Sequence, residues 1–504
     1  MSEYTKYRLL EILPGLLVWV FLIGGAALAF LKPMWLIYYI LIFDIYWVFR
    51  VIYFSFYLIV AWRRFRRSLQ TDWLTLVKTK TGWEEIVHCI FLPLYNEDEE
   101  VVRTTLNGII ANSYPSQKMI VVLAGEERQK EHFKSFAQKI AQEFRPYFRD
   151  FILTLHPAGL SGEIPGKGSN LHFAGHRVRE YVDAHQIPYD KIIVSAFDID
   201  TIVHRHYFAC LTHTFLTHPN PTRVSYQPVA LYNNNIWESP AILRIMAFGT
   251  TFWILFAQAR PDSLVTFSSH SMSFRALVDV NFWAKDIVSE DSRIFWQCLL
   301  HYGGEYSVVP LYLPVSMDTV RDDSWWRSIV NLYKQQRRWA WGVEHVPYLL
   351  WNFWGNKRIK LFERLRRAFN QWEGKFSWAT TSFTILLFGR LPLWVAAEEV
   401  RKTVLFENTP HILEWLMIFA MSAILISIIL SLTVLPHPPK ETHSHRKLIM
   451  ILQWLLLPVS LILVSAIPAI DATTRLMFGK YLGFNVSQKK RETRPPPILL
   501  SQNV

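Results

Sequence analysis

Long apolar segments at both ends of the chain restrict its fold more than any other feature of the sequence. Leu9–Leu31 is apolar over about the 20 residues that a helix needs to cross a bilayer. A second apolar run, from Met34 to about Trp62, follows the break at Lys32-Pro33. The first run is too long for a cleaved signal peptide and no small-residue cleavage site follows it. The two runs therefore predict a transmembrane hairpin.

Three further apolar segments near the other end of the chain are each long enough to span a bilayer: Phe376–Ala397, His411–Leu435 and Leu448–Ile470. A cytoplasmic insert followed by three spans would place the basic tail, "SQKKRETR", outside the cell. The positive-inside rule favours the tail inside. One of the segments is therefore expected to be re-entrant or not to cross, and the sequence leaves open which one.

The basic cluster "WRRFRRS" at the end of the second run fixes the orientation of the hairpin. Lysine and arginine near a span favour the cytoplasmic side, so the segment that follows is expected in the cytoplasm. The cluster itself is interpreted as contacting lipid headgroups. The location predicted for the whole chain is the plasma (bacterial inner) membrane.

Charge and cysteine content exclude other classes of protein. The net charge of +12 in 504 residues fits an anionic membrane surface, an anionic substrate or nucleic acid. No polar, low-complexity basic arm accompanies this charge, so no nucleic-acid partner is predicted. The three cysteines form no CxxC pair and are interpreted as core thiols in a reducing compartment.

Between the membrane segments, from about Gly82 to Trp372, short apolar runs alternate with amphipathic stretches. This pattern predicts an α/β domain with a Rossmann-like, mostly parallel sheet. The apolar stretch Pro240–Ala259 within this insert is either a buried core helix or an interfacial one. The expected strands are Ile86–Leu92, Met119–Leu123, Phe151–Leu155 and Lys191–Ala196, and the expected helices are Glu97–Ala111, Glu127–Phe144, Ser169–Ala184 and Ser292–Leu300.

Two predicted strands end in polar residues. The first runs into "FLPLYNEDEEVV", at the end of the sheet where open α/β folds bind ligands. The fourth runs into "AFDIDT", where Asp198 and Asp200 are separated by one residue. In an extended segment both carboxylates would face one side and hold Mg²⁺ or Mn²⁺ together with a diphosphate. The alternative is that one of them caps a helix starting near Val203.

Two loops carry further candidates. The glycine-rich "HPAGLSGEIPGKGSNLHFAG" lacks P-loop spacing, so Lys167 either reaches an anionic ligand or belongs to a plain connecting loop. In "DIVSEDSRIFWQ", Asp291 is a candidate general base, while Ser289 or Glu290 is a candidate helix cap.

The stretch "YKQQRRWAWG", Tyr333–Gly342, combines three cations with three aromatic residues. On a helix, residues i, i+3 and i+4 share a face, so Gln335, Arg338 and Trp339 are expected to face a pocket that contains Asp291. The other face, with Tyr333, Arg337 and Trp341, is interpreted as resting on lipid headgroups. A zinc site at His204 and His206 is rejected in favour of two histidines on a helix surface.

These motifs, "LPLYNE", "GKGSN", "FDID", "SED" and "QQRRW", stand in this order between membrane segments. In this the chain resembles membrane-integrated family 2 glycosyltransferases of the cellulose, hyaluronan and chitin synthase type. The resemblance implies a GT-A fold for the cytoplasmic domain, a nucleotide-sugar donor (usually a UDP-sugar), Mg²⁺ or Mn²⁺, and inversion at the anomeric carbon.

The resemblance also implies roles for individual residues. Asp291 would be the catalytic base, and Asp198 and Asp200 would hold the metal. Members of this family usually have an aspartate after the second strand. Here that place reads "VVLAGEERQ", where Glu126 or Glu127 is the only acidic substitute, and this weakens the expectation that the donor nucleotide is UDP. The residues implied in nucleotide-sugar binding are Pro93, Tyr95, Glu97, Glu126, Lys167 and Asp198, and those implied at the acceptor and diphosphate are Glu290, Gln335, Arg338 and Trp339.

The function predicted is transfer of a sugar to the hydroxyl of a growing polysaccharide at the membrane. Two alternatives stay open: transfer of one sugar to a ceramide- or polyprenyl-phosphate-type lipid, and an inactive scaffold or transporter. The expected partners are the donor, a glycan or lipid acceptor and membrane lipids, with room for an accessory subunit. The expected division is a transmembrane hairpin (1–62), a basic linker (63–81), a GT-A domain (82–345), interfacial helices (346–375), a second transmembrane region (376–470) and a basic tail (471–504).

Overall fold

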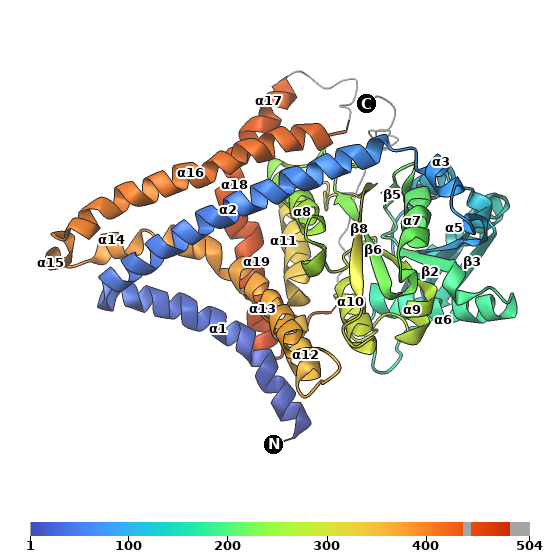
Figure 1. Ribbon diagram of the computed structural model, residues 1–504, viewed down its shortest axis with the longest axis horizontal. Coiled ribbons are helices and arrows are strands. Elements are labelled where there is room, and N and C mark those ends of the chain that lie inside the picture. The colour runs from blue at the N-terminus through green and yellow to red at the C-terminus, as the bar shows by residue number, and fades with distance from the viewer. Residues whose placement is uncertain (1, 437–444, 484–504) are drawn as a thin grey trace.

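The structure is a computed structural model that describes residues 2–436 and 445–483 of the chain. An α/β unit lies on one side of the molecule, and long helices extend from it to the other side (Figure 1). The α/β unit is formed by the middle of the chain, whereas the extending helices come from both ends. The predicted arrangement, an α/β domain between apolar helical segments, is therefore confirmed.

An eight-stranded sheet forms the centre of the α/β unit, in the order β3-β2-β1-β4-β7-β6-β8-β5. The first four strands pair in parallel, as β6 and β8 also do, while β5 and β7 run antiparallel to their neighbours. The prediction of a mostly parallel sheet is confirmed. The strands are β1 Val87–Pro93, β2 Met119–Glu126, β3 Asp150–His156, β4 Ile192–Ala196, β5 Ile202–Val203, β6 Val224–Leu231, β7 Ser271–Ser273 and β8 Ser307–Ser316.

Helices cover both faces of this sheet, because successive side chains of a strand point to opposite faces. In β1, Ile90 and Leu92 pack into a core with α4, α5 and α7, whereas Cys89 and Phe91 pack into a second core with α6, α9 and α10. Buried, near-continuous apolar strands are typical of parallel sheets covered on both sides. The helices are α4 Glu99–Ile110, α5 Lys130–Phe144, α6 Lys167–Ala184, α7 Tyr207–Thr217, α9 Phe274–Asp279 and α10 Glu290–His301.

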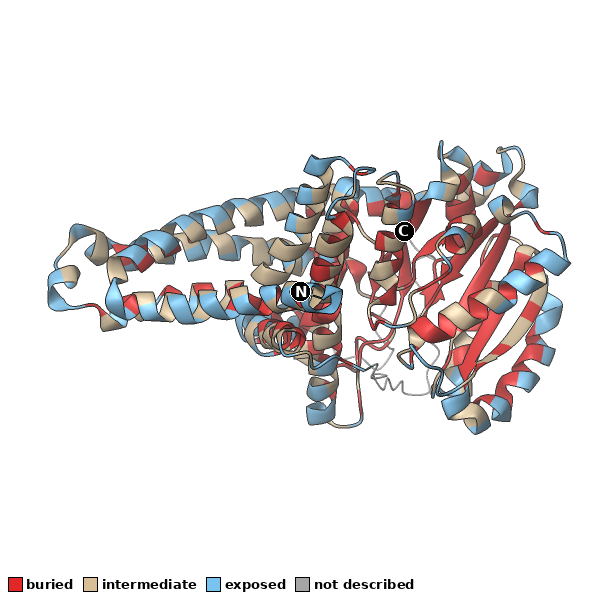
Figure 2. Ribbon diagram, turned by 90° about the horizontal axis from the view of Figure 1, so that it is seen from below, coloured by how far each residue is buried: buried red, intermediate tan, exposed pale blue. Residues whose placement is uncertain are grey.

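Five helical segments of the described chain are long and apolar enough to cross a membrane. In α1, α2 and α16 only 17–22% of the most apolar window is buried, so most of this apolar surface faces outward (Figure 2). Exposed apolar surface on this scale requires lipid, and the chain is a membrane protein. The five segments are Glu3–Leu31 (α1), Pro33–Gln70 (α2), Ala241–Gln258 (α8), Val404–Val434 (α16) and Leu448–Met477.

The segment expected as a span at Phe376–Ala397 is not one continuous helix. Helix α13, Leu361–Phe383, passes into a π-helical turn, and the short α14, Leu391–Val395, follows. Pro392 lies in the first turn of α14, where its missing N–H is tolerated, so the helix restarts there instead of continuing. Helix α15, Glu398–Arg401, then leads into α16.

The last helical segment, Leu448–Met477, lies beside the α/β unit. It consists of the end of α17 (His445–Leu452), α18 (Leu457–Leu461) and α19 (Ile467–Met477), joined by a 3₁₀ turn and a π turn. Near its start, the Arg244 Nε donates to the Gln453 side chain at 2.7 Å. Near its end, the Arg337 Nη1 lies 2.9 Å from the Asp471 Oδ2. Both ends therefore contact the same α/β unit.

This segment changes the interpretation of two helices. Helix α8 packs on β6, on α2 and, through Phe248 and Phe252, on Trp454, which favours the buried alternative. On α11, Trp325–Ala340, the side chains of Tyr333 and Arg337 both bind Asp471. Trp341 is fully buried, so the expectation that it rests on headgroups is wrong, and the partly buried Tyr333 and Arg337 are directed to Asp471.

Candidate active site

The carboxyl ends of β2, β1 and β4 lie side by side at one edge of the sheet. Ligands bind at this edge in open α/β folds. Pro93 and Glu126 are the last residues of β1 and β2, and Asp198 follows β4 by two residues. Lys167, expected in a loop, is the first residue of α6.

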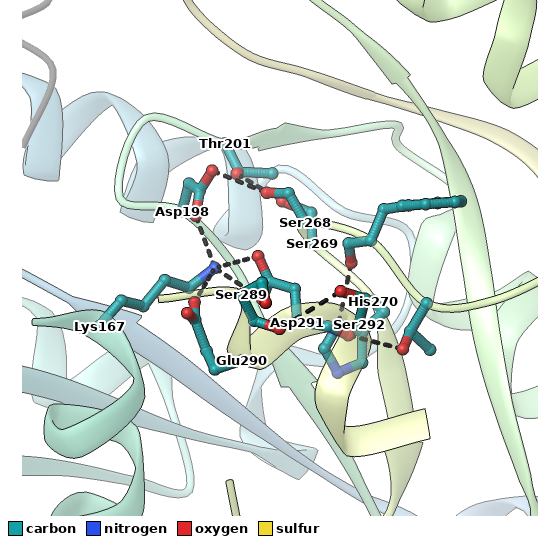
Figure 3. A network of polar contacts seen from close by, with 12 residues as sticks. Lys167, Asp198, Thr201, Ser268, Ser269, His270, Ser289, Glu290, Asp291 and Ser292 are labelled. Atoms are coloured by element: carbon teal, nitrogen blue, oxygen red, sulfur yellow. Dashed lines mark hydrogen bonds and ion pairs between the residues drawn. The ribbon is translucent and has the colours of Figure 1, made fainter. Parts of the chain in front are cut away.

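Lys167 joins the predicted site residues into one cluster. Its Nζ lies 2.8 Å from the Asp198 Oδ1, 2.9 Å from the Asp291 Oδ1 and 3.8 Å from the Glu290 Oε1. Figure 3 shows the ammonium group in the middle of the three carboxylates. These residues come from three different parts of the chain, the starts of α6 and α10 and the end of β4. We call Lys167, Asp198, Glu290 and Asp291 the lysine–acid cluster.

Burial and mutual charge set the protonation states in this cluster. Burial lowers the pKa of Lys167, but the Asp198, Asp291 and Glu290 carboxylates outweigh it and raise the pKa above its ordinary value. Burial also raises the pKa of Glu290 to about 8, with Asp291 adding to the rise and Lys167 opposing it. Lys167 is therefore charged at neutral pH, and Glu290 tends to keep its proton.

A glycine allows the two helix starts to approach each other. A Cβ on Gly168 would lie 2.7 Å from the Ala284 carbonyl oxygen and 3.1 Å from the Glu290 Cβ. The first distance is far below normal contact, so any larger residue would push α6 away from the segment before α10. Because Lys167 precedes this glycine, the close approach also places its ammonium group near Asp291.

The segment with the two aspartates differs from the expectation. Asp198–Asp200 is not extended but lies in a turn closed by the Thr201 N–H and the Asp198 carbonyl. Its two side chains therefore have different surroundings: Asp198 is partly exposed beside Lys167, whereas Asp200 is buried and accepts the Asp318 N–H at 2.7 Å. The expectation that both project to one side as on a strand is wrong.

The donor set still fits a divalent cation. Residues 2–436 and 445–483 contain no group of three or more His, Cys, Asp or Glu side chains that could hold a metal. Mg²⁺ and Mn²⁺ sites commonly take one or two carboxylates and complete their shell with phosphate oxygens and water. Asp198, partly exposed at the carboxyl edge of the sheet, provides such a carboxylate.

A second group of predicted residues meets at the ends of β1 and β2. The Glu126 carboxylate pairs with the Arg128 guanidinium, which lies 4.8 Å from the centroid of the Tyr95 ring. The Tyr95 N–H donates to the Glu97 carboxylate at 2.9 Å. A flat guanidinium beside an aromatic ring is a suitable surface for a nucleotide base. Arg128 was not among the predicted residues.

A crevice between α8 and α11 contains the remaining candidates. Gln335 and Trp339 line it together with Tyr232, whose ring centroid lies 5.7 Å from that of Trp339. The charge of Arg338 lowers the pKa values of Glu290 and Tyr232, although burial raises both overall, so the guanidinium lies near the lysine–acid cluster. The crevice therefore lies beside the cluster.

Sequence patterns gave no sign of the segment "TFSSH", residues 266–270. The Thr266 hydroxyl donates to the Asp291 carbonyl at 2.6 Å, and the Ser268 hydroxyl donates to the Asp198 Oδ2 at 2.7 Å. The segment thus connects the two halves of the cluster (Figure 3). Small hydroxyl residues without characteristic spacing are typical of any connecting loop, so the sequence did not mark this segment as part of a site.

The two histidines after the aspartates do not lie on a helix surface. His204 and His206 are both buried and precede α7, which begins at Tyr207. Burial lowers the pKa of His204 to about 3, and His206 makes a 2.9 Å hydrogen bond with Ser113. The expected helix start near Val203 is wrong because the short strand β5 pairs with β8 there.

Comparison with known proteins identifies the class. The chain is a homologue of glycosyltransferases that synthesise polysaccharides, which confirms the predicted resemblance and the predicted kind of enzyme. Over 338 residues it is 25% identical to the poly-beta-1,6-N-acetyl-D-glucosamine synthase of Staphylococcus aureus, covering 67% of this chain and 71% of that protein. The synthase of the same name from Staphylococcus epidermidis is 24% identical over 328 residues, or 64% of this chain and 68% of that protein.

Solved structures of other glycosyltransferases align with the chain at low identity. The mannosyltransferase PcManGT from Pyrobaculum calidifontis, in complex with GDP-Man and Mn²⁺, has a TM-score of 0.41 and 13% identity over 77% of this chain and 99% of its own. TarS 1–349 from S. aureus, in complex with UDP-GlcNAc, has a TM-score of 0.34 and 13% identity over 70% and 93%. No family model matches the chain.

Proposed function

We propose that the chain is an inverting glycosyltransferase that moves a hexose from a nucleotide-sugar, in the first instance a UDP-sugar, to a growing polysaccharide. The acceptor hydroxyl oxygen forms a bond to the anomeric carbon while the bond to the diphosphate breaks. Asp291 takes the hydroxyl proton, and the nucleoside diphosphate leaves. One displacement inverts the anomeric centre, so a single base is sufficient.

The lysine–acid cluster is the observation that carries this proposal. It brings the residue proposed as base within 2.9 Å of a lysine that also holds Asp198 at 2.8 Å. A leaving diphosphate needs positive charge nearby as its own charge develops. Lys167 from the cluster and Arg338 from the neighbouring helix supply that charge in our proposal.

The remaining predicted residues receive roles from their positions. Asp198, supported by Asp200 behind it, would hold a divalent cation, which when bound neutralises charge on the diphosphate. Tyr95, Glu97 and Glu126, with Pro93 at the strand end, would face the nucleotide. Glu290, Gln335 and Trp339 would face the acceptor, where the indole ring offers a sugar an apolar surface.

The membrane arrangement supports a cytoplasmic catalytic domain in the bacterial inner membrane. If Leu448–Met477 lies along the α/β unit, four crossings remain: α1, α2, α13–α14 and α16. These four extend to the same far end of the molecule (Figure 1). An even number would return the chain to the side of the α/β unit and would remove the conflict between the number of spans and the basic tail. The tail lies outside the described residues.

The test is incubation of the purified protein in detergent with a panel of nucleotide-sugars and Mn²⁺, followed by measurement of nucleotide release and product size. A long polymer supports the proposal. A product consisting of one sugar on a lipid would contradict the polysaccharide acceptor and support the lipid acceptor instead. No nucleotide release from any donor would leave the scaffold or transporter alternative.

Replacement of the base gives the sharpest residue-level check. We expect Asp291→Asn to lower kcat by about 100-fold or more, because general base catalysis contributes about 10²- to 10⁴-fold. The donor KM should change little, since the residue faces the acceptor hydroxyl. Asp262→Asn, a change at an exposed aspartate of the same unit, is the matched control. Equal activity in Asp291→Asn and wild type would remove Asp291 from the mechanism.

A further inference from the structure

Two residues that follow the helix α11 contact both ends of the first turn of α10, which carries Asp291. Glu344 ends a 3₁₀ turn, Trp341–Glu344, and His345 begins α12, His345–Phe353. The Ser289 hydroxyl donates to the Glu344 Oε1 at 2.5 Å, and the His345 Nε2 lies 2.7 Å from the Ser292 hydroxyl. These contacts lie on both sides of Glu290 and Asp291 in the sequence.

The serine contact replaces a contact that the helix would normally make. Ser289 occupies the N-cap position of α10, yet its hydroxyl makes no cap hydrogen bond. A serine at this position usually stabilises a helix by accepting a hydrogen bond from a backbone N–H of the first turn. The hydroxyl is directed to Glu344 instead, so the link to the 3₁₀ turn after α11 is formed at the expense of a local cap.

The hydrogen bonds also fix the orientation of the two side chains. The Arg293 Nε donates to the His345 Nδ1 at 3.3 Å, so the proton of the neutral ring lies on Nε2 and is donated to Ser292. The Glu344 Oε2 accepts the Trp341 indole N–H at 2.9 Å. Both carboxylate oxygens of Glu344 are thus occupied by donors from two different elements.

We infer that Glu344 and His345 are positioning residues. They hold the first turn of α10, which carries Asp291, in place relative to α11, the helix whose Gln335 and Trp339 are proposed to face the acceptor. The inference rests on the proposed function. It explains why the base and the acceptor-facing residues Gln335 and Trp339, which lie on separate elements, keep a fixed relation. A displacement of about 1 Å at a reacting group costs up to about 100-fold in rate.

The charge of Glu344 gives the link a pH dependence. Burial raises the pKa of Glu344 to about 7, with Arg293 opposing the rise. The titratable and charged groups that face it are Arg293 on α10, Asp286 in the preceding loop, Tyr7 on α1, Lys375 on α13, and His345, which shares its contact with Ser289. Below this pKa the carboxylate loses its charge and accepts more weakly, so the link weakens as the pH falls.

The experiment compares Glu344→Gln, Ser289→Ala, the double variant and Glu305→Gln, an exposed acid of the same unit, as control. We expect kcat in the first two to fall by about 10- to 100-fold, with the donor KM unchanged. The double variant should lose no more than the worse single variant, since both changes break one link. In Glu344→Gln the fall of kcat with decreasing pH near 7 should be absent.

A second measurement separates positioning from loss of folding. Hydrogen exchange in residues 285–292 should accelerate in Glu344→Gln, while the rest of the α/β unit keeps its wild-type protection. Wild-type kcat and pH profile in Glu344→Gln would overturn the inference alone. Uniformly faster exchange with an unchanged pH profile would also overturn it, in favour of a structural role. An inactive wild type would overturn the proposed function and the inference with it.

Discussion

A single amino group determines the electrostatics of the site. Lys167 lies among three carboxyl groups, with its side chain only 10% exposed. Without this cation the three carboxylates would repel one another, and desolvation would favour the neutral form of the buried Glu290. The lysine charge opposes the rise in the pKa of Glu290, the most buried of the three, but burial outweighs it and this carboxyl retains its proton more readily.

Glu290 should make the stability of the protein depend on pH. Its pKa is raised by burial to about 8, whereas an unfolded glutamate ionises near about 4.3. Between these values the folded state binds more protons than the unfolded state, so stability falls as the pH rises. Glu290→Gln stays neutral, and we expect its melting temperature relative to wild type to be about 2–4 °C higher at about pH 8 than at about pH 5.

Thermal unfolding in detergent at the two pH values measures this difference. Glu131→Gln, at an exposed position of α5, is the control and should show the same offset from wild type at both pH values. An offset for Glu290→Gln that does not change with pH would contradict the raised pKa.

At the scale of elements, the approach of α6 to the segment before α10 decides where Lys167 lies. We expect Gly168→Ala to destabilise the α/β unit by about 1–3 kcal/mol, because the new methyl group would overlap the Ala284 carbonyl oxygen. The change should also weaken donor binding, since it displaces the neighbouring Lys167. Unfolding in urea and titration with the nucleoside diphosphate measure the two effects.

Gly249→Ala in α8 is the matched control. A Cβ there meets nothing within 4 Å, and alanine is the better helix former by about 1 kcal/mol. This variant should be as stable as wild type or more so. Equal stability of Gly168→Ala and wild type would show that α6 can move without cost.

The contact between α11 and α19 holds α11, which forms one side of the crevice. Arg337 and Asp471 are 2.9 Å apart, and their side chains are 16% and 24% exposed. In a double-mutant cycle with alanine we expect a coupling free energy of about 0.5–3 kcal/mol from unfolding in detergent. The exposed pair Arg177 and Glu180, at the same distance on α6, should couple by no more than about 0.5 kcal/mol. Equal coupling in both pairs would contradict the structural role of α19.

At the scale of the whole molecule, the course of Leu448–Met477 decides the topology. Four crossings predict that the last described residue, Gly483, lies on the same side of the membrane as the α/β unit, with α15 on the opposite side. A membrane-impermeant thiol reagent should label Glu399→Cys in intact cells. Gly483→Cys and Glu131→Cys should react only after lysis.

The native cysteines interfere little, because all three are buried and free. Labelling of Gly483→Cys in intact cells, with Glu131→Cys protected, would mean that the last segment crosses the bilayer. That result would restore five spans and place the end of the chain outside.

Periodicity and local motifs were sufficient to predict the α/β class, the first four strands and the membrane character. These depend on apolar residues that repeat within a few positions of one another. Asp198, Asp291 and Trp339 were predicted instead from short motifs and helical spacing. The role of each residue stays a prediction. The turn at Asp198–Asp200 was missed because it is imposed by Thr201 and by the buried contact of Asp200 with Asp318.

The sequence by itself determined which segments are apolar enough for lipid and which motifs follow strand ends, because both are properties of neighbouring residues. Only the tertiary structure decided that the last apolar segment lies along the α/β unit and that Lys167 joins three acids. It alone brought Glu344 and His345 to the turn of Asp291. These contacts join residues far apart in the chain, and their geometry depends on how whole elements pack, which no local pattern encodes.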